Sequence, residues 1–279
     1  MKQDIIKQAP IGIFDSGYGG LTILSDIRRV LPQYDYIYLG DNARAPYGTR
    51  SFEIVYRFTL EAVQYLFDQG CQLVILACNT ASAKALRSIQ QKDLPHIDPN
   101  RRVLGVIRPT VEALSSITQN GEIGLLGTPG TINSGSYTAE VAKLYPQYNV
   151  YGQPCPMWVP LIENNETNNE GAHYFVKKYT DALMSQNENI DTVILGCTHY
   201  PLLYPLIRQH LPSQVKLLSQ GALVADSLKD YLERHPEMEQ RCSQGGSCTY
   251  LTTESKTKFT EAATRFLNDT ITARQIELG

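Results

Sequence analysis

The sequence predicts an α/β protein of two pseudo-symmetric domains, each built on a mainly parallel β-sheet. Runs of branched apolar residues alternate along the chain with segments of helical periodicity, which is typical of parallel sheets with crossover helices. Two of the apolar runs, 74–76 and 193–195, are each followed by a small residue, a cysteine and hydrogen-bonding side chains. This repeated order indicates two similar halves, in each of which a thiol follows a buried strand.

Strands are expected where β-branched residues and leucine run together, because such runs suit a strand buried on both faces. They fall at residues 11–14, 36–39, 74–76, 103–106, 123–126, 193–195 and 215–218, and a further strand and helix are expected near the C-terminus. Polar residues that follow such strands lie at the carboxyl edge of a sheet, where open α/β sheets bind ligands.

Helices are expected where apolar residues recur at helical spacing. The first such segment follows Gly20 and has Ile23, Ile27, Val30 and Leu31 on one face. One further helix is expected after Pro109 and another is expected to begin at Pro201. The remaining helices are expected at residues 55–66, 81–89, 172–184 and 222–232. Residues 94–102 are expected to form a linker and 164–169 a polar loop. The prolines within 155–163 are expected to prevent a regular helix there.

The length of 279 residues is sufficient for two domains. We expect residues 103–212 to form the second α/β domain, and residues 1–102 together with 213–279 to form the first. The net charge is −3 and there is no run of Lys or Arg, so neither nucleic acid nor a membrane surface is an expected partner. The first seven residues lack the apolar core of a signal peptide, and no stretch reaches the ~20 apolar residues of a membrane span.

The six cysteines are expected to be thiols in a reducing, cytoplasmic compartment, because the chain is long and shows no secretion signal. Cys242 and Cys248, with only His235 nearby, do not make up a set of four zinc ligands. No metal site is therefore expected.

The glycine-rich turn after the first strand presents Asp15 and Ser16 beside a helix N-terminus. A G-x-G-x-x-G dinucleotide motif is excluded, because Thr22 stands where its last glycine is needed. The free N–H groups of the helix could bind an anion such as a carboxylate. An ordinary N-cap formed by Asp15 or Ser16 is an equally good interpretation.

Residues 40–48 form a loop dense in turn residues, which is either a surface connection or a ligand-binding loop. In the second case, Tyr47 and the Gly48 backbone could reach a small polar molecule. Arg44 is expected to be a solvated surface charge.

Cys78 and Cys197 could each be an inert core thiol, because cysteine is among the most buried residue types. Two thiols that face one ligand suit the inversion of a stereocentre, in which one face loses a proton and the other gains one. A Cys-His hydrolase has no use for a second opposing Cys, and a redox pair would favour C-x-x-C. Asp15 could accept a proton from Cys78. His199 could serve Cys197, since residues i and i+2 of an extended segment point the same way, unless it is only structural.

Four segments resemble the signature segments of bacterial glutamate racemase, a member of the aspartate/glutamate racemase family. In chain order they are 14–21 (Phe-Asp-Ser-Gly-Tyr-Gly-Gly-Leu), 46–48 (Pro-Tyr-Gly), 77–81 (Ala-Cys-Asn-Thr-Ala) and 196–202 (Gly-Cys-Thr-His-Tyr-Pro-Leu). The resemblance implies a cofactor-independent, cytoplasmic, homodimeric enzyme that supplies D-glutamate for peptidoglycan. It also implies an active site in the cleft between the two domains.

By this resemblance, Cys78 would be the base acting on D-glutamate and Cys197 the base acting on L-glutamate. Asp15 would assist Cys78, and His199 would assist Cys197. Glu163, which alone reads as a loop carboxylate, matches the acidic residue of the family near that histidine. The residues implied to hold the substrate are Asp15, Ser16, Pro46, Tyr47, Gly48, Asn79, Thr80, Thr128, Thr131, Thr198 and His199.

Two positions depart from the family pattern. Arg108-Pro109 stands where the family often has Glu-Pro, and Ser219-Gln220-Gly221 where it often has Asp-Ser-Gly. Neither touches the thiol pair, so they bear on regulation or domain contacts. Two alternative functions are an aspartate racemase and a non-catalytic binding or inhibitory protein on the same scaffold.

Overall fold

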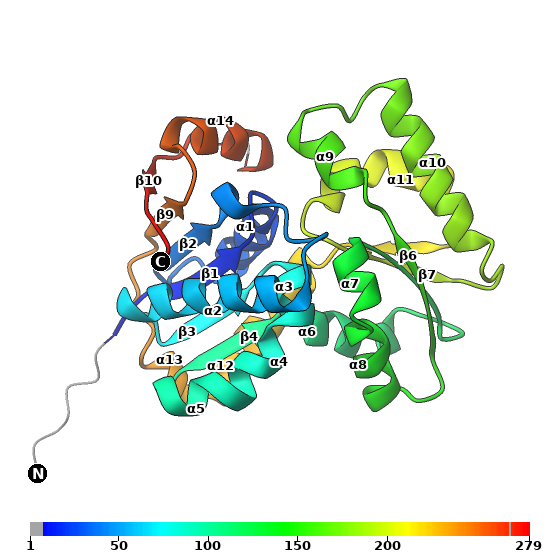
Figure 1. Ribbon diagram of the computed structural model, residues 1–279. Helices are drawn as coiled ribbons and strands as arrows, with labels where there is room; N and C mark the ends of the chain where they lie inside the picture. The colour runs from blue at the N-terminus through cyan, green and yellow to red at the C-terminus, as the bar shows by residue number, and fades with distance from the viewer. Residues whose placement is uncertain (1–7, 268) are drawn as a thin grey trace, which may run out of the picture.

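The computed structural model describes residues 8–267 and 269–279, which form two lobes (Figure 1). Each lobe contains one sheet, and every pair of neighbouring strands in both sheets is parallel. We call them the first and second lobe. The predicted α/β class with mainly parallel sheets is confirmed. The first seven residues, in which no signal-peptide core was found, lie outside the described part of the chain.

The sheet of the first lobe has six strands in the order β10-β9-β2-β1-β3-β4. Their bounds are β1 (Ile11–Asp15), β2 (Tyr36–Gly40), β3 (Leu73–Leu76), β4 (Arg102–Gly105), β9 (Cys248–Thr252) and β10 (Ala273–Gln275). The C-terminal strand β9 thus pairs with β2, from the N-terminal part of the chain, and β10 pairs with β9 at the edge of the sheet.

The sheet of the second lobe has four strands in the order β6-β5-β7-β8. Their bounds are β5 (Glu122–Gly127), β6 (Asn149–Pro154), β7 (Thr192–Gly196) and β8 (Lys216–Leu218). The strands that precede Cys78 and Cys197, β3 and β7, lie inside their sheets and are completely buried, as the apolar runs predict.

Helices cover these sheets and connect them. In the first lobe they are α1 (Gly20–Val30), η1 (Asn42–Arg44), α2 (Phe52–Asp68), α3 (Asn79–Lys84), α4 (Leu86–Ser88), the π-helical η2 (Ile89–Asp93), α5 (Leu94–Ile97), α12 (Gly221–Arg234), α13 (Pro236–Glu239) and α14 (Lys256–Leu267). In the second they are α6 (Ile107–Glu112), η3 (Ala113–Ser116), α7 (Pro129–Asn133), α8 (Ser136–Leu144), α9 (Trp158–Glu163), α10 (Glu170–Met184), η4 (Tyr200–Leu203) and α11 (Tyr204–His210).

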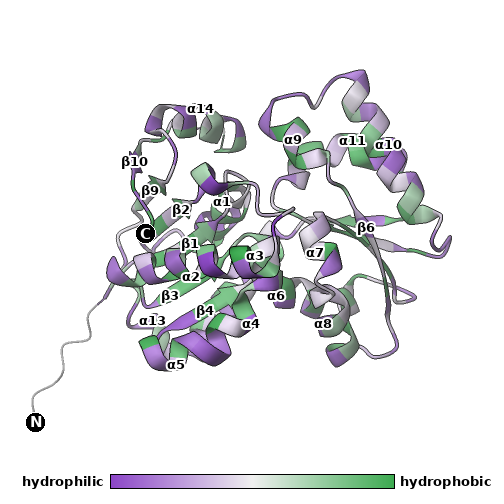
Figure 2. Cartoon of the chain, in the orientation of Figure 1, coloured by the Kyte–Doolittle hydropathy of each residue, from purple (hydrophilic) through white to green (hydrophobic). Residues whose placement is uncertain are grey.

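The first sheet has a hydrophobic core on each of its faces. Ile13 and Ile75 belong to the cluster under α1 and α12, whereas Phe14 and Val74 belong to the cluster under α2. Successive residues of a strand point to opposite faces, so a run of apolar residues fills both cores. The hydropathy colouring shows β1 and β3 mainly hydrophobic, while the outer helices mix both kinds of residue (Figure 2).

The sheets divide the chain at other places than the sequence suggested. β4 was expected to open the second domain, but it pairs with β3 of the first sheet. β8 was expected to return to the first domain, but it pairs with β7 of the second. The sheet that a strand joins depends on long-range pairing, which its own residues do not encode. We propose the two lobes as the domains of the chain, with the crossings after β4 and after β8.

Three prolines lie in the first turn of helices. The sequence suggested a linker or an irregular segment around two of them, and a helix that only follows the third, Pro109. Pro95 is in α5, Pro109 in α6 and Pro160 in α9. The N–H groups of a first turn have no acceptor within the helix, so a proline is tolerated there. The expectations of a linker over 94–102 and of no helix within 155–163 are therefore wrong. Similarly, Pro201 lies in the 3₁₀-helix η4 and does not start α11.

None of the helices within the described residues combines the length and apolar character that crossing a membrane requires.

Candidate active site

A cavity of about 60 Å³ lies between the lobes, at the carboxyl ends of both sheets. A volume of this kind holds roughly four to six water molecules, which is the scale of one free amino acid. The predicted residues that line it are Ser16, Pro46, Tyr47, Gly48, Cys78, Asn79, Thr80, Thr128, Glu163, Cys197, Thr198 and His199. No Lys or Arg is among the lining residues.

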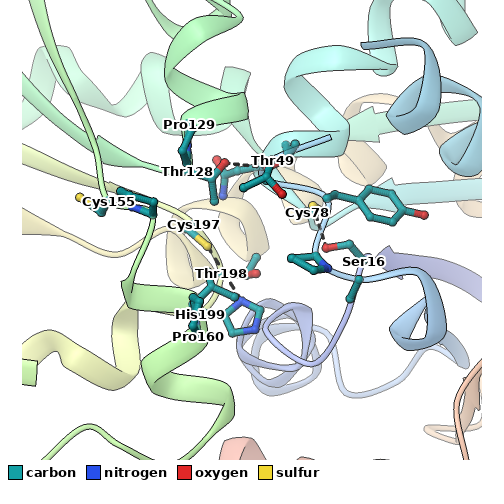
Figure 3. Close-up of a pocket in the computed structure, with 18 of the residues that line it drawn as sticks. Ser16, Thr49, Cys78, Thr128, Pro129, Cys155, Pro160, Cys197, Thr198 and His199 are labelled. Carbon is teal, nitrogen blue, oxygen red and sulfur yellow. Dashed lines mark hydrogen bonds between the residues drawn. The ribbon is translucent and has the colours of Figure 1, made fainter. Parts of the chain in front are cut away.

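Cys78 and Cys197 face the cavity from opposite sides, one from each lobe (Figure 3). Cys78 follows β3 and Cys197 follows β7, and both side chains are nearly buried, with 6% and 7% of their surface exposed. The alternative that they are inert thiols in separate cores is wrong, because both open onto one cavity. Matching strand-end positions in two similar lobes produce this placement.

The thiol of Cys78 lies 3.4 Å from the hydroxyl of Ser16, and its sulfur accepts the N–H of Ala81 at the start of α3. Burial, together with the negative charge of Asp15, raises the pKa of Cys78 to about 12. Cys78 is therefore protonated at neutral pH and can serve as a proton donor.

His199 connects Cys197 to a carboxylate. Its Nδ1 lies 3.9 Å from the sulfur of Cys197, and its Nε2 lies 3.0 Å from Oε1 of Glu163. Burial alone would lower the pKa of His199, but the hydrogen bonds to Cys197 and Glu163 raise it to about 10. The ring is an imidazolium at neutral pH, so a cation lies directly beside the sulfur of Cys197.

Asp15 is fully buried at the end of β1 and is not among the residues that line the cavity. Its carboxyl group accepts the N–H of Gly17 at 2.9 Å and the hydroxyl of Thr198 at 3.5 Å, and the backbone of Gly20 also bonds to it. The group that accepts the N–H groups at this helix N-terminus is thus the carboxyl group of Asp15. Gly19 caps α1 without a side-chain hydrogen bond, so the interpretation of an ordinary N-cap by Asp15 or Ser16 is wrong.

Asp15 also carries a raised pKa. Burial raises the pKa of its carboxyl group, and the charge of His199 with the N–H groups of Gly20 and Gly17 opposes part of this rise. Among the hydrogen bonds of the described residues, the partners of the Cys78 sulfur are the Ser16 hydroxyl and the Ala81 N–H, and Asp15 is not one of them. The electrostatic effect of Asp15 on Cys78 is to raise the pKa of the thiol.

The loop 40–48 borders the cavity, so the surface-connection interpretation is wrong. Tyr47 lines the cavity, but its hydroxyl donates to the buried Asp41. Arg44 also bonds to Asp41 and to Glu61, and only 21% of its side chain is exposed. The expectation of a solvated Arg44 is wrong, because two carboxylates hold it against the loop.

Three threonines join the lobes beside the cavity. The Thr80 hydroxyl lies 2.9 Å from that of Thr128 and 3.2 Å from that of Thr131. Thr128 also caps α7 by accepting the N–H of Thr131 at 3.2 Å. Thr80 and Thr128 line the cavity, whereas Thr131 does not and instead supports these two.

Several lining residues were missed from the sequence. They are Ala45, Thr49, Pro129, Cys155, Pro156, Val159 and Pro160. Cys155 follows β6 just as Cys78 and Cys197 follow their strands, and this strand-end position was the available signal. The signal was weaker at Cys155, because Pro156 follows it where hydrogen-bonding residues follow Cys78 and Cys197. Among the described residues, no group of three or more His, Cys, Asp or Glu side chains is arranged to hold a metal ion.

Glycines allow the lobes to meet on both sides of the cavity. The N–H of Gly130 donates to the carbonyl of Gly48 at 2.7 Å, and a Cβ on Gly130 would lie 2.8 Å from that oxygen. A Cβ on Gly19 would overlap the Thr198 hydroxyl and Nδ1 of His199. These two contacts, Gly48–Gly130 and Gly19–His199, form what we call the glycine seam.

The glycine seam gives a testable prediction for Gly19→Ala. The new methyl group would displace His199 from Cys197, so we expect kcat/KM for the racemisation proposed below to fall roughly 10- to 100-fold. The control is Gly171→Ala in the exposed first turn of α10, where the nearest atom to a Cβ is the side-chain oxygen of Asn169 at 3.2 Å. Equal rates for both variants would contradict the prediction.

The fold and the site together define a class of two-lobed α/β proteins that present two opposed cysteines to one cavity. A family model described as Asp/Glu/Hydantoin racemase matches residues 22–228. The chain belongs to this family.

Individual relatives agree with this assignment. A glutamate racemase from Ruegeria sp. (strain TM1040) is 42% identical over 273 residues, which cover 94% of this chain and 98% of that protein. The crystal structure of a glutamate racemase isoform from Bacillus anthracis superposes with a TM-score of 0.88 at 35% identity, covering 98% of both chains. A glutamate racemase from Francisella tularensis in complex with D-glutamate gives a TM-score of 0.86 at 32% identity, covering 97% of this chain and 98% of that chain.

Proposed function

We propose that this chain is a cofactor-independent glutamate racemase, which interconverts L- and D-glutamate by proton transfer at Cα and supplies D-glutamate for peptidoglycan synthesis. The observation that carries the proposal is the pair of thiols on opposite sides of one amino-acid-sized cavity. Full-length similarity to glutamate racemases supports the substrate. A related aspartate racemase would need a shorter pocket for the side-chain carboxylate.

In the direction from L to D, the thiolate of Cys197 takes the proton from Cα and becomes a thiol. The electron pair of the broken C–H bond stays on Cα. The thiol of Cys78 then gives its proton to the opposite face, a new C–H bond forms, and Cys78 is left as the thiolate. In the direction from D to L, the same two steps run in reverse.

The two sides of the cavity are prepared differently for these steps. The imidazolium of His199, held by Glu163, places a cation beside Cys197, whereas burial keeps Cys78 protonated. We therefore take Cys197 as the base for L-glutamate and Cys78 as the proton donor to the opposite face. L- and D-glutamate have equal free energy in water, so kcat/KM must be the same for both. The asymmetry is expected in kcat and KM taken separately.

The substrate is held without a basic side chain from Lys or Arg. Hydroxyl and amide donors line the cavity, and they can bind the two carboxylates of glutamate. We assign this role to Ser16, Asn79, Thr80, Thr128 and Thr198, with the Gly48 backbone. Pro46 and the ring of Tyr47 shape the wall, and Asp15 and Thr131 support these groups from behind.

We place the protein in the cytoplasm as a homodimer. The six cysteines, all free thiols in the structure, suit a reducing compartment, and the dimer rests on the family resemblance alone. Size-exclusion chromatography with light scattering tests the dimer, since a monomeric mass would contradict it.

The activity is tested by incubating the protein with L-glutamate in heavy water. We expect the optical rotation to fall to zero while deuterium enters at Cα. L-aspartate in a parallel reaction should racemise much more slowly. Faster reaction of aspartate would move the assignment to an aspartate racemase, and no reaction of either would favour a non-catalytic binding protein.

A further inference from the structure

A closed ring of three hydrogen bonds lies behind the cavity, where the lobes meet. Nδ2 of Asn79 donates to Oε1 of Gln220 at 2.6 Å, and Nε2 of Gln220 donates to the hydroxyl of Tyr137 at 2.7 Å. The Tyr137 hydroxyl donates to Oδ1 of Asn79 at 2.6 Å and closes the ring. All three side chains are buried, and Asn79 also lines the cavity next to Cys78. We call this arrangement the amide ring.

The direction of every bond in the amide ring follows from one main-chain carbonyl. The hydroxyl of Thr110 donates to the carbonyl of Val106 at 2.7 Å, so it can only accept from Gln220, whose Nε2 lies 2.7 Å away. The oxygen of Gln220 must then face Asn79, which places the NH₂ group of Asn79 toward Gln220. The oxygen of Asn79 faces the Tyr137 hydroxyl for the same reason.

The amide ring therefore fixes what Asn79 offers to the cavity. One of its two N–H hydrogens goes to Gln220, and its oxygen is bonded to Tyr137. Within the described part of the chain, the second N–H has no hydrogen-bond partner. A donor with this constraint suits an anionic oxygen and not an ammonium group.

The amide ring also joins the two lobes. Asn79 is the first residue of α3 in the first lobe, Tyr137 lies on α8 in the second, and Gln220 precedes α12 where the chain crosses back. Figure 1 shows α3, α6 and α8 close to one another at the junction of the lobes. The orientation of Asn79 thus depends on both lobes being in place.

We propose that Gln220 is a positioning residue, which acts through the amide ring to hold Asn79 as a donor to a carboxylate oxygen of the substrate. This inference rests on the proposed function. Gln220 stands where the resembled family often has serine. A serine has a single O–H donor on a short side chain, so it cannot accept from Asn79 while donating to both Tyr137 and Thr110. The role therefore depends on the side-chain amide of Gln220.

The test begins with Gln220→Met, which keeps the length of the side chain and removes the amide. We expect KM for both enantiomers to rise roughly 10- to 100-fold, the scale of one hydrogen bond to a charged group. The value of kcat should stay close to that of the wild type, because the thiols are not moved. The matched control is Gln72→Met, which loses an amide hydrogen bond to the carbonyl of Gly70. Gln72 directly precedes β3, at the amino ends of the strands and thus at the end of the sheet away from the cavity.

A second variant, Tyr137→Phe, breaks the amide ring while Gln220 is retained, and it tests the inference if Gln220→Met does not fold. The KM of the double variant should rise no further than that of the worse single variant, because the ring acts as a unit. An unchanged KM in Gln220→Met, or single effects that multiply in the double variant, would overturn the inference. If the wild type itself does not racemise glutamate, the proposed function fails instead, and wild-type activity is measured first for that reason.

Discussion

Cys78→Ala and Cys197→Ala are each expected to lower kcat/KM for racemisation by about 10²- to 10⁴-fold or more, the range for loss of a general acid or base. The two sulfurs face the cavity from different lobes, so neither can reach both faces of a bound amino acid. The loss must be equal for L- and D-glutamate, since the equilibrium constant between them is fixed. Polarimetry with each enantiomer measures it.

Each cysteine variant should nevertheless retain half of the reaction. In Cys78→Ala, Cys197 can still remove the Cα proton of L-glutamate and return a deuteron from heavy water to the same face. We expect deuterium to enter L-glutamate only, and to enter D-glutamate only in Cys197→Ala. Cys248→Ala, a half-buried thiol on β9 far from the cavity, is the control. Deuterium in both enantiomers with one thiol missing would refute the two-base mechanism.

His199→Asn is expected to lower kcat/KM at neutral pH by about 10²- to 10³-fold. The variant removes the imidazolium beside Cys197, so it should lack the fall in rate that the wild type shows as His199 loses its proton toward pH 10. Glu163→Gln should produce a smaller loss in the same direction, because it weakens the support of the imidazolium. A pH series from 6 to 10 measures both effects.

The matched control for His199 is His173→Asn, because His173 is exposed on α10. A His199→Asn variant with the pH profile of the wild type would contradict the role of the imidazolium.

The free energy of unfolding should also depend on the protonation of His199. The pKa of His199 is raised in the folded protein to about 10, compared with about 6.5 for an unperturbed histidine. Its contribution to the free energy of unfolding is therefore complete below pH 6.5 and is lost as the pH rises toward 10. Over this range wild-type stability should fall more steeply than that of His199→Asn, and urea unfolding at several pH values measures the difference.

Local pattern was sufficient to predict most of the strands and the two thiols, but it missed β6, whose residues are only partly buried. The runs before Cys78 and Cys197 are buried on both faces in any parallel sheet, so their ends could be placed at a ligand-binding edge. The contact of His199 with Cys197 was predicted, but the reason given for it was wrong, because residues 197–199 form a turn and not an extended segment. Glu163 came only from the resemblance, because in sequence it lies 36 residues from its partner His199.

Long-range pairing could not be predicted in this way. The sheets joined by β4 and β8 are chosen by strands far along the chain, and the amide ring brings together residues from three distant segments. The hydroxyl of Tyr47 and the guanidinium of Arg44 both turn to Asp41, whose burial no local pattern reveals. The first-turn prolines show a second limit of prediction from sequence. A proline can either end a helix or stand in its first turn, so the residue alone does not say which of the two occurs.

The Gly48–Gly130 contact of the glycine seam bears on which amino acids fit. A side chain at the wall of a pocket can rotate aside to admit a larger guest, but a main-chain N–H bonded to a main-chain carbonyl has no such freedom. Gly48 lines the cavity, so a bulkier amino acid that displaced it would also strain its bond to the second lobe. We therefore expect side-chain mutations elsewhere around the cavity to relax discrimination by size only weakly.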